Sequence, residues 1–218
     1  MSRNWHPLSA AILAGGQSRR MGRNKALLPL VEGGPAMIEI VLGRLRSVAD
    51  EVTIVANDRE QYALFGARIV PDLLPGAGTL AGIHAALSAA RNEHCLIVAC
   101  DMPFLNTALL AVMSARPRDY DVLVPLLPGE SRQRADGLVY QTLHAIYSRT
   151  CIGPIERQLA GGNRQVIGFF PDVRIETLGV DEVARYDPEL RSFFNANTPE
   201  TLANARQLSI GRELDGEP

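Results

Sequence analysis

The chain has 218 residues, and its 22 Lys and Arg against 24 Asp and Glu give a formal net charge of −2. This length suits one domain of roughly 100–200 residues that needs neither disulfides nor a structural metal. The near-neutral charge argues against a dedicated nucleic-acid-binding protein. The longest apolar runs fall short of the roughly 20 residues that span a membrane. The N-terminus shows no signal-peptide pattern, and the three cysteines form no CxxC, which predicts a cytoplasmic location.

Short apolar runs alternate with helical periodicities, which predicts an α/β fold with a mostly parallel central sheet. In the first half we predict strands over 9–14, 52–56, 68–70 and 95–100, and helices over 37–48 and 80–90. The strand over 95–100 (CLIVAC) is continuously apolar, which is typical of a central strand buried on both faces.

The second half continues the alternation less regularly. We predict helices over 107–115 and 148–160, and strands over 121–125 and 137–141. Thr198 is the predicted N-cap, and Pro199 the first-turn proline, of a helix through Leu208. The expected organisation is a single domain over 1–210 and a disordered tail over 211–218.

The first predicted strand leads into the segment LAGGQSRRMGRNK, from Leu13 to Lys25. Its three glycines allow backbone N–H groups to approach a ligand, and four cationic side chains fall within seven residues with no acid among them. Ligands of open α/β sheets bind beyond the carboxyl ends of strands, so this pattern predicts a polyphosphate site. The spacing fits neither the Walker P-loop nor the dinucleotide fingerprint. The alternative is a glycine-rich surface turn with solvated arginines.

Two acidic residues follow later strands. Asp101 comes directly after the central strand, where a desolvated carboxylate needs a partner and a hard cation is the usual one. Its alternative role is a helix N-cap, although Asn106 and Thr107 lie closer to the predicted helix start. Asp72 follows the strand over 68–70 and has an Asx turn as its alternative.

The segment from Leu13 to Lys25 resembles the signature loop of the nucleotidyltransferases that activate sugars and cofactors. Its Leu-Ala-Gly-Gly form is similar to that of the molybdenum cofactor guanylyltransferases. Three further segments extend the resemblance over 9–208: CDMPF, PDLLPGAGTLAG and NANTPE. The resemblance implies a three-layer Rossmann-like nucleotidyltransferase fold. It also implies transfer of GMP from GTP to molybdopterin or Mo-molybdopterin with release of pyrophosphate, Mg²⁺ as the cofactor, and transient contact with molybdopterin-handling proteins.

The resemblance also implies roles for individual residues. The implied catalytic residues are Arg19, Lys25 and Asp101, and Asp101 is the implied Mg²⁺ ligand. The implied nucleotide-binding residues are Leu13, Ala14, Gly15, Gly16, Lys25, Asn57, Asp72, Gly78, Gly82 and Asp101, with the N–H groups of 13–16 holding the nucleotide. For the acceptor, the implied residues are Gln141, Asn195 and Asn197, and Asn197 could add an oxygen ligand to the metal.

Some features leave alternatives open. Val55 stands where many relatives have Asn, so the residues around the nucleotide base can be arranged differently here. Thr142 stands where relatives have Pro, so the same holds for the residues around the pterin. His144 is equally a partly buried histidine with satisfied hydrogen bonds or a ligand, while Cys95 and Cys100 are expected to pack as small apolar residues. Two other functions fit the same pattern. One is transfer from CTP or another nucleotide to a different phosphorylated acceptor, and the other is non-catalytic nucleotide binding by a regulatory protein.

Overall fold

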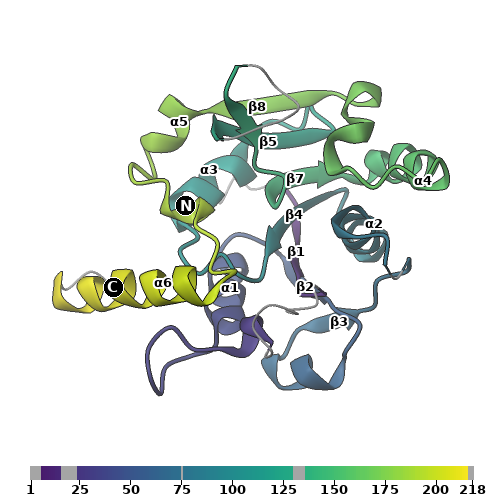
Figure 1. The fold of residues 1–218 in the computed structure, drawn as a ribbon. Coiled ribbons are helices and arrows are strands. Elements are labelled where there is room, and N and C mark those ends of the chain that lie inside the picture. The colour runs from purple at the N-terminus through teal and green to yellow at the C-terminus, as the bar shows by residue number, and fades with distance from the viewer. Residues whose placement is uncertain (1–5, 16–23, 75, 130–135, 216–218) are drawn as a thin grey trace.

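A mixed sheet forms the middle of the computed structural model, which describes residues 6–15, 24–74, 76–129 and 136–215 (Figure 1). The strands run in the order β3-β2-β1-β4-β7-β5-β6, and β8 pairs with β5. Their bounds are β1 Ser9–Leu13, β2 Glu51–Val55, β3 Arg68–Val70, β4 His94–Ala99, β5 Val122–Pro128, β6 Leu138–Tyr140, β7 His144–Ser148 and β8 Ile175–Gly179.

Helices connect the strands and cover both faces of the sheet. Their bounds are α1 Met37–Arg46, α2 Thr79–Ala89, α3 Thr107–Ala115, α4 Ile152–Ala160, α5 Val180–Ala184 and α6 Pro199–Asp215. Shorter 3-10 turns span Lys25–Leu27, Glu60–Phe65, Arg149–Cys151, Val166–Asp172 and Arg191–Phe193. Figure 1 shows α1 and α3 on one side of the sheet, with α2 and α4 on the other.

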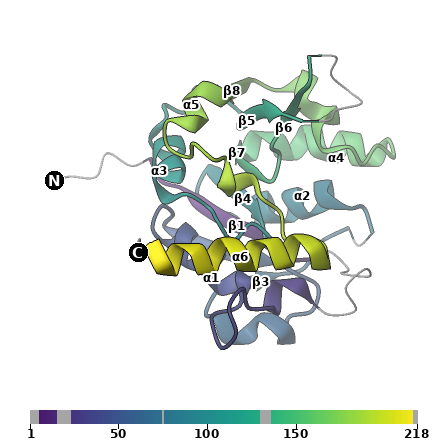
Figure 2. The same cartoon turned by 60° about the vertical axis from the view of Figure 1, so that its left-hand side comes forward.

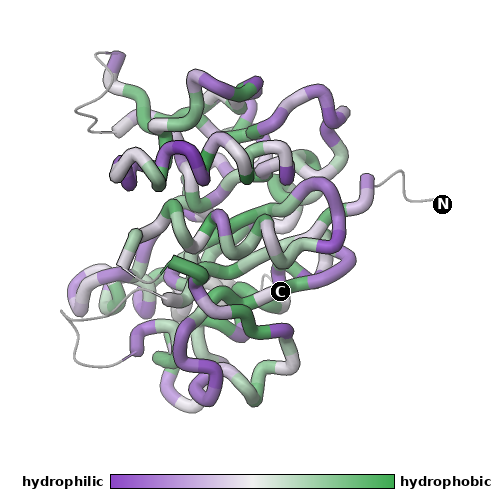
Figure 3. The backbone as a smooth tube through the Cα atoms, turned by 90° about the vertical axis from the view of Figure 1, so that its right-hand side faces the viewer, coloured by the Kyte–Doolittle hydropathy of each residue, from purple (hydrophilic) through white to green (hydrophobic). Residues whose placement is uncertain are grey.

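The apolar side chains divide between two core layers because successive residues of a strand face opposite sides. In β4, Leu96 and Val98 pack with α1 and α3, whereas Cys95 and Ile97 pack with α2 and α4. Every residue of β4 is buried, as the continuous apolar run predicted. Figure 3 shows the hydrophobic stretches inside the molecule and the hydrophilic ones on its outer turns.

The sheet is parallel at its core, from β3 through β2 and β1 to β4, and this part of the predicted fold is confirmed. Strand β7 runs antiparallel to both β4 and β5, and β8 adds a second parallel pair with β5. The three-layer arrangement therefore holds, with an antiparallel strand inserted between two parallel groups.

Two strands were not predicted, and one helix start was wrong. β7 ends at Ser148, whose hydroxyl accepts a hydrogen bond from Thr150 N (3.1 Å) and so starts a 3-10 turn. Helix α4 consequently begins at Ile152 rather than at 148. In β8 only Leu178 is fully buried, so this strand carries no alternating apolar signal.

Helix α6 begins as predicted and ends later. Thr198 Oγ1 accepts from Thr201 N (3.1 Å), and Thr201 Oγ1 accepts from Thr198 N (2.9 Å), which is a reciprocal N-terminal cap. The helix continues to Asp215, so its predicted end at Leu208 is wrong. It lies beside α1 (Figure 2), where Leu202 packs in a small apolar cluster with Met37.

The described helices include none with the length and apolar character needed to cross a membrane. The division into one domain and a tail over 211–218 stays a prediction; residues 211–215 form the end of α6, and 216–218 lie outside the described residues.

Candidate functional site

The carboxyl ends of β1, β2 and β4 meet at one edge of the sheet. Leu13, the last residue of β1, pairs with Val55 of β2 on one side and with Ala99 of β4 on the other. Two backbone hydrogen bonds continue this alignment past the strands, from Ala14 N to Val55 O (2.9 Å) and from Cys100 N to Leu13 O (3.2 Å). The segments predicted to carry the chemistry therefore lie next to one another.

At this edge, Lys25 and Asp101 form an ion pair. Lys25 Nζ donates a hydrogen bond to Asp101 Oδ2, and the two side chains are 19% and 9% exposed. The N-cap alternative for Asp101 is excluded, because Asn106 caps α3 by accepting from Ala108 N (2.9 Å) and Leu109 N (3.1 Å). Asp101 is thus a buried carboxylate held beside a cation of the predicted polyphosphate segment.

The NANTPE segment reaches the same place from the C-terminal end of the chain. Ala196 N donates to the carbonyl oxygen of Asp101 (2.9 Å), and Ala196 is fully buried. Its neighbours Asn195 and Asn197 are exposed on either side of this contact. The backbone bond brings both asparagines to the end of β4, while their roles toward an acceptor stay predictions.

Asn57 and Asp72 lie together beyond β2 and β3. Asn57 Oδ1 accepts from Asp72 N (2.9 Å), and Asp72 Oδ1 accepts from Leu74 N (2.9 Å). The second bond is the Asx turn that was the structural alternative for Asp72. The turn is present, and a further role of Asp72 in nucleotide binding stays a prediction.

Gly78 and Gly82 each have a structural reason to be glycine. Gly78 is the N-cap of α2 and has φ +78°, in the region that L side chains rarely adopt. A Cβ on Gly82 would lie 3.2 Å from Leu13 Cδ1, closer than side chains normally approach. These glycines hold the first turns of α2 against the end of β1.

The backbone donors predicted for the nucleotide begin one residue after Ala14, later than expected. The Ala14 N–H, predicted as a donor to the nucleotide, is engaged with Val55 O inside the sheet. The backbone donors that we predict therefore begin at Gly15. Gly16 and Arg19 lie outside the described residues.

On the acceptor side, Gln141 precedes β7, where its backbone N–H donates to Pro125 O (2.9 Å) and its carbonyl accepts from His144 N (2.9 Å). His144 pairs in register with Val98 of β4. Gln141 therefore lies at the same sheet edge as Asp101, one strand further along.

Arg164 is a residue that the sequence did not single out. It follows α4, and its Nη1 donates to the carbonyl of Gly76 (2.9 Å), in the segment between β3 and α2. The sequence shows only a helix end at Gly161-Gly162 there. No local pattern could indicate a contact that joins segments 88 residues apart.

Two groups near the site are kept uncharged by burial. Burial lowers the pKa of His144 to about 4, and its ring centroid lies 4.7 Å from that of Phe193. His144 is fully rather than partly buried, and neither ring nitrogen has a hydrogen-bond partner within the described part of the chain, so the hydrogen-bonded interpretation is not borne out. Burial raises the pKa of the Cys100 thiol to about 12, and Cys95 and Cys100 pack in the two core layers as expected.

The described residues contain no group of three or more His, Cys, Asp or Glu side chains that could hold a metal ion. A single carboxylate nevertheless fits Mg²⁺, since this ion is often bound by one or two carboxylates together with substrate phosphates and water. Asp101 supplies such a carboxylate at the edge where the predicted phosphate segment begins.

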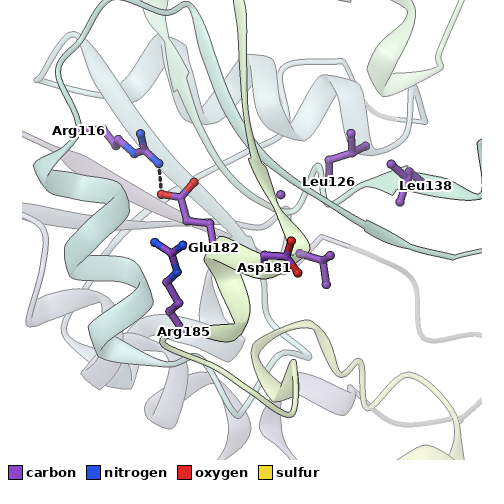
Figure 4. A pocket seen from close by; sticks show the side chains of 8 residues that line it. Arg116, Leu126, Leu138, Asp181, Glu182 and Arg185 are labelled. Carbon is purple, nitrogen blue, oxygen red and sulfur yellow. Dashed lines mark hydrogen bonds and ion pairs between the residues drawn. The ribbon is translucent and has the colours of Figure 1, made fainter.

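An open pocket of about 610 Å³ lies at the carboxyl ends of β5 and β8. Figure 4 shows Arg116, Glu182 and Arg185 on one side of it and Leu126 and Leu138 on the other. Arg116 is hydrogen-bonded to Glu182 and lies 3.2 Å from Glu176 Oε1. Two carboxylates thus balance the charge of Arg116 within the protein.

Known proteins resemble this chain over most of its length. The model of the family described as "MobA-like NTP transferase domain" matches residues 10–174. A "Probable molybdenum cofactor guanylyltransferase" of Pelotomaculum thermopropionicum is 43% identical over 92% of this chain and 93% of its own. A "Molybdenum cofactor guanylyltransferase" of Desulfosudis oleivorans is 36% identical over 94% and 98%.

Among solved structures, the Archaeoglobus fulgidus protein titled "Molybdopterin-guanine dinucleotide biosynthesis protein A" superposes with a TM-score of 0.76 at 28% identity. The match covers 93% of this chain and 99% of that one.

Proposed function

Because the chain belongs to the family of MobA-like NTP transferases, we propose that it transfers GMP from GTP to molybdopterin or Mo-molybdopterin and releases pyrophosphate. The observation that carries the proposal is the Lys25–Asp101 pair, which joins the predicted polyphosphate segment to the end of β4. The NANTPE segment is hydrogen-bonded to the same aspartate, so one edge collects the predicted nucleotide and acceptor residues.

The reaction joins two phosphates. An oxygen of the acceptor's phosphate attacks the α-phosphorus of GTP, the bond between the α-phosphorus and the bridging oxygen breaks, and pyrophosphate leaves with that oxygen. A phosphate monoester is already ionised near neutral pH, so the nucleophile needs no catalytic base. The protein's contribution is positioning and charge stabilisation.

Lys25 and Asp101 divide the charge stabilisation. The Lys25 ammonium neutralises the polyphosphate of GTP, as does Arg19 in this proposal, while backbone N–H groups from Gly15 onward orient it. Asp101 would hold Mg²⁺, to which Asn197 could add an oxygen ligand. When bound, Mg²⁺ neutralises charge that develops on the phosphate oxygens. In this proposal the guanine base of GTP is bound near Asn57, Asp72 and the start of α2.

The acceptor would lie on the other side of Asp101. Gln141 and the exposed asparagines Asn195 and Asn197 offer hydrogen-bonding groups there without adding charge. The three cysteines are free and buried, which supports a reducing compartment and hence a cytoplasmic location. Transient contact with molybdopterin-handling proteins would supply this acceptor.

Time-resolved pyrophosphate release tests the proposal with each nucleotide and each acceptor. GTP with molybdopterin should give one pyrophosphate per molecule of dinucleotide formed. Release only with CTP, or only with a different phosphorylated acceptor, would keep the fold and overturn the guanylyl assignment. Nucleotide binding without release would favour the regulatory alternative.

A further inference from the structure

A buried tyrosine connects the two ends of the predicted polyphosphate segment. Tyr62, in the 3-10 turn Glu60–Phe65, is 1% exposed and packs its ring in the core layer beneath α1. Its hydroxyl donates to Ala14 O (3.2 Å) and accepts from Asn24 Nδ2 (2.8 Å). One oxygen atom thus joins the residue before Gly15 to the residue before Lys25.

The Asn24 side chain is held through both ends of its amide. Nδ2 donates a second hydrogen bond to Gln61 Oε1 (2.6 Å), while Oδ1 accepts from Ala26 N (3.2 Å). The latter bond caps the 3-10 turn Lys25–Leu27. The backbone from which Lys25 projects toward Asp101 is therefore fixed from the turn that contains Tyr62.

Ala14 is fixed in a complementary way. Its N–H donates to Val55 O, and its carbonyl accepts from Tyr62, so both of its backbone polar groups are used inside the protein. Gly15 follows directly and is exposed. Burial raises the pKa of Tyr62, so its hydroxyl keeps its proton near neutral pH and can both donate and accept.

We propose that Tyr62 is a positioning residue for nucleotide binding: its hydroxyl sets the backbone at Gly15 and the Lys25 ammonium at the separation that a polyphosphate requires. The inference rests on the proposed function, because these are the groups assigned there to the phosphates of GTP. Tyr62 itself is buried and does not touch the ligand. It acts by holding two phosphate-binding groups in place before the nucleotide arrives, which lowers the cost of binding.

The direct test is Tyr62→Phe, which keeps the ring and removes only the hydroxyl. We expect the Kd for GTP, measured by calorimetry well below the melting temperature, to rise about tenfold. The Kd for inorganic tripolyphosphate should rise by a similar factor, because the loss concerns the phosphates and not the base. In turnover, KM for GTP should rise more than kcat falls.

Tyr120→Phe is the matched control. Tyr120 is also buried, and its hydroxyl accepts a hydrogen bond from Arg118 just before β5, at the opposite edge of the sheet. Its loss should lower the melting temperature while leaving both Kd values unchanged. If Tyr62→Phe behaves in the same way, its hydroxyl is merely structural and the inference is wrong.

Asn24→Ser supplies a second variant that does not alter the core. Serine keeps a capping oxygen for the turn but removes the amide that donates to Tyr62. Asn24→Ser should also bind GTP more weakly than the wild type. The double variant should bind GTP no more weakly than the weaker of the two single variants, because both changes break the same connection. Unchanged affinity in Asn24→Ser overturns the inference even if Tyr62→Phe fails to fold. Wild-type protein that binds neither GTP nor tripolyphosphate would instead overturn the proposed function.

Discussion

Lys25 Nζ donates a hydrogen bond to Asp101 Oδ2, joining the end of the predicted polyphosphate segment to the end of β4 across 76 residues of sequence. The ammonium contacts one of the two oxygens that a divalent cation would use. The two proposed roles are therefore coupled. If Asp101 held a metal ion, its bond to Lys25 would weaken, and the Lys25 ammonium would be free to pair with the phosphates of the nucleotide.

Asp101→Asn should separate these roles. It removes the charge that attracts Mg²⁺, so Mg²⁺-dependent pyrophosphate release should fall at least about a hundredfold. In EDTA, however, GTP should bind the variant at least as well as it binds the wild type, because Lys25 no longer has a competing partner. Turnover near the wild-type rate would contradict the role of Asp101 as a metal ligand.

Lys25→Ala should weaken GTP binding and also destabilise the fold. From the sequence this lysine looks exposed, but it is largely buried against a buried carboxylate, so its removal leaves Asp101 without its partner. We expect a loss of about 1–3 kcal/mol in the free energy of unfolding, measured in urea. Arg91→Ala is the control, since Arg91 is exposed beside Glu51 at the opposite edge. Wild-type GTP affinity in Lys25→Ala would exclude the phosphate role.

The choice of nucleotide is open to a simple thermal test. GTP with Mg²⁺ should raise the melting temperature more than CTP does, since the segment at Leu13 has the Gly-Gly form and Asp72 is present. A ligand at about 100 times its Kd stabilises the folded state by roughly 2.7 kcal/mol, which a melting curve resolves. A larger shift with CTP would contradict the guanylyl assignment and leave the fold unaffected.

His144 should make stability depend on pH. Burial lowers its pKa to about 4, against 6.5 for an ordinary histidine, so below pH 6.5 the unfolded chain binds a proton that the folded chain does not. The contribution of neutral His144 to the free energy of unfolding is complete above pH 6.5 and is lost as the pH falls toward 4. It amounts to at most about 3 kcal/mol.

The measurement is urea unfolding of wild type and His144→Phe at pH 7 and pH 5. The variant should lose less stability between these values, because phenylalanine takes up no proton. The nearby charge of Asp187 acts to raise the pKa of His144, and the larger effect of burial outweighs it. Equal losses in the two proteins would show that His144 does not cause the pH dependence.

The sequence predicts those parts of the site that have a strong local signal. β4 is a continuous apolar run, Asp101 follows it directly, and Thr198 precedes Pro199 at a helix start. Contacts between distant segments have no such signal: nothing near Tyr62 indicates that its hydroxyl meets both Ala14 and Asn24. Strand β8 is missed for a related reason, since one fully buried side chain makes no pattern.

The direction of β7 determines which part of the chain is free to change. Because β7 runs against β4, it contributes its beginning rather than its end to the functional edge, and the segment just before it carries Gln141 and Thr142. This segment lies between β6 and β7, away from β1, β2 and β4, which precede the predicted nucleotide-binding residues. Exchange of Thr142 for proline should therefore leave β1, β2 and β4 unchanged, because this segment is not part of them.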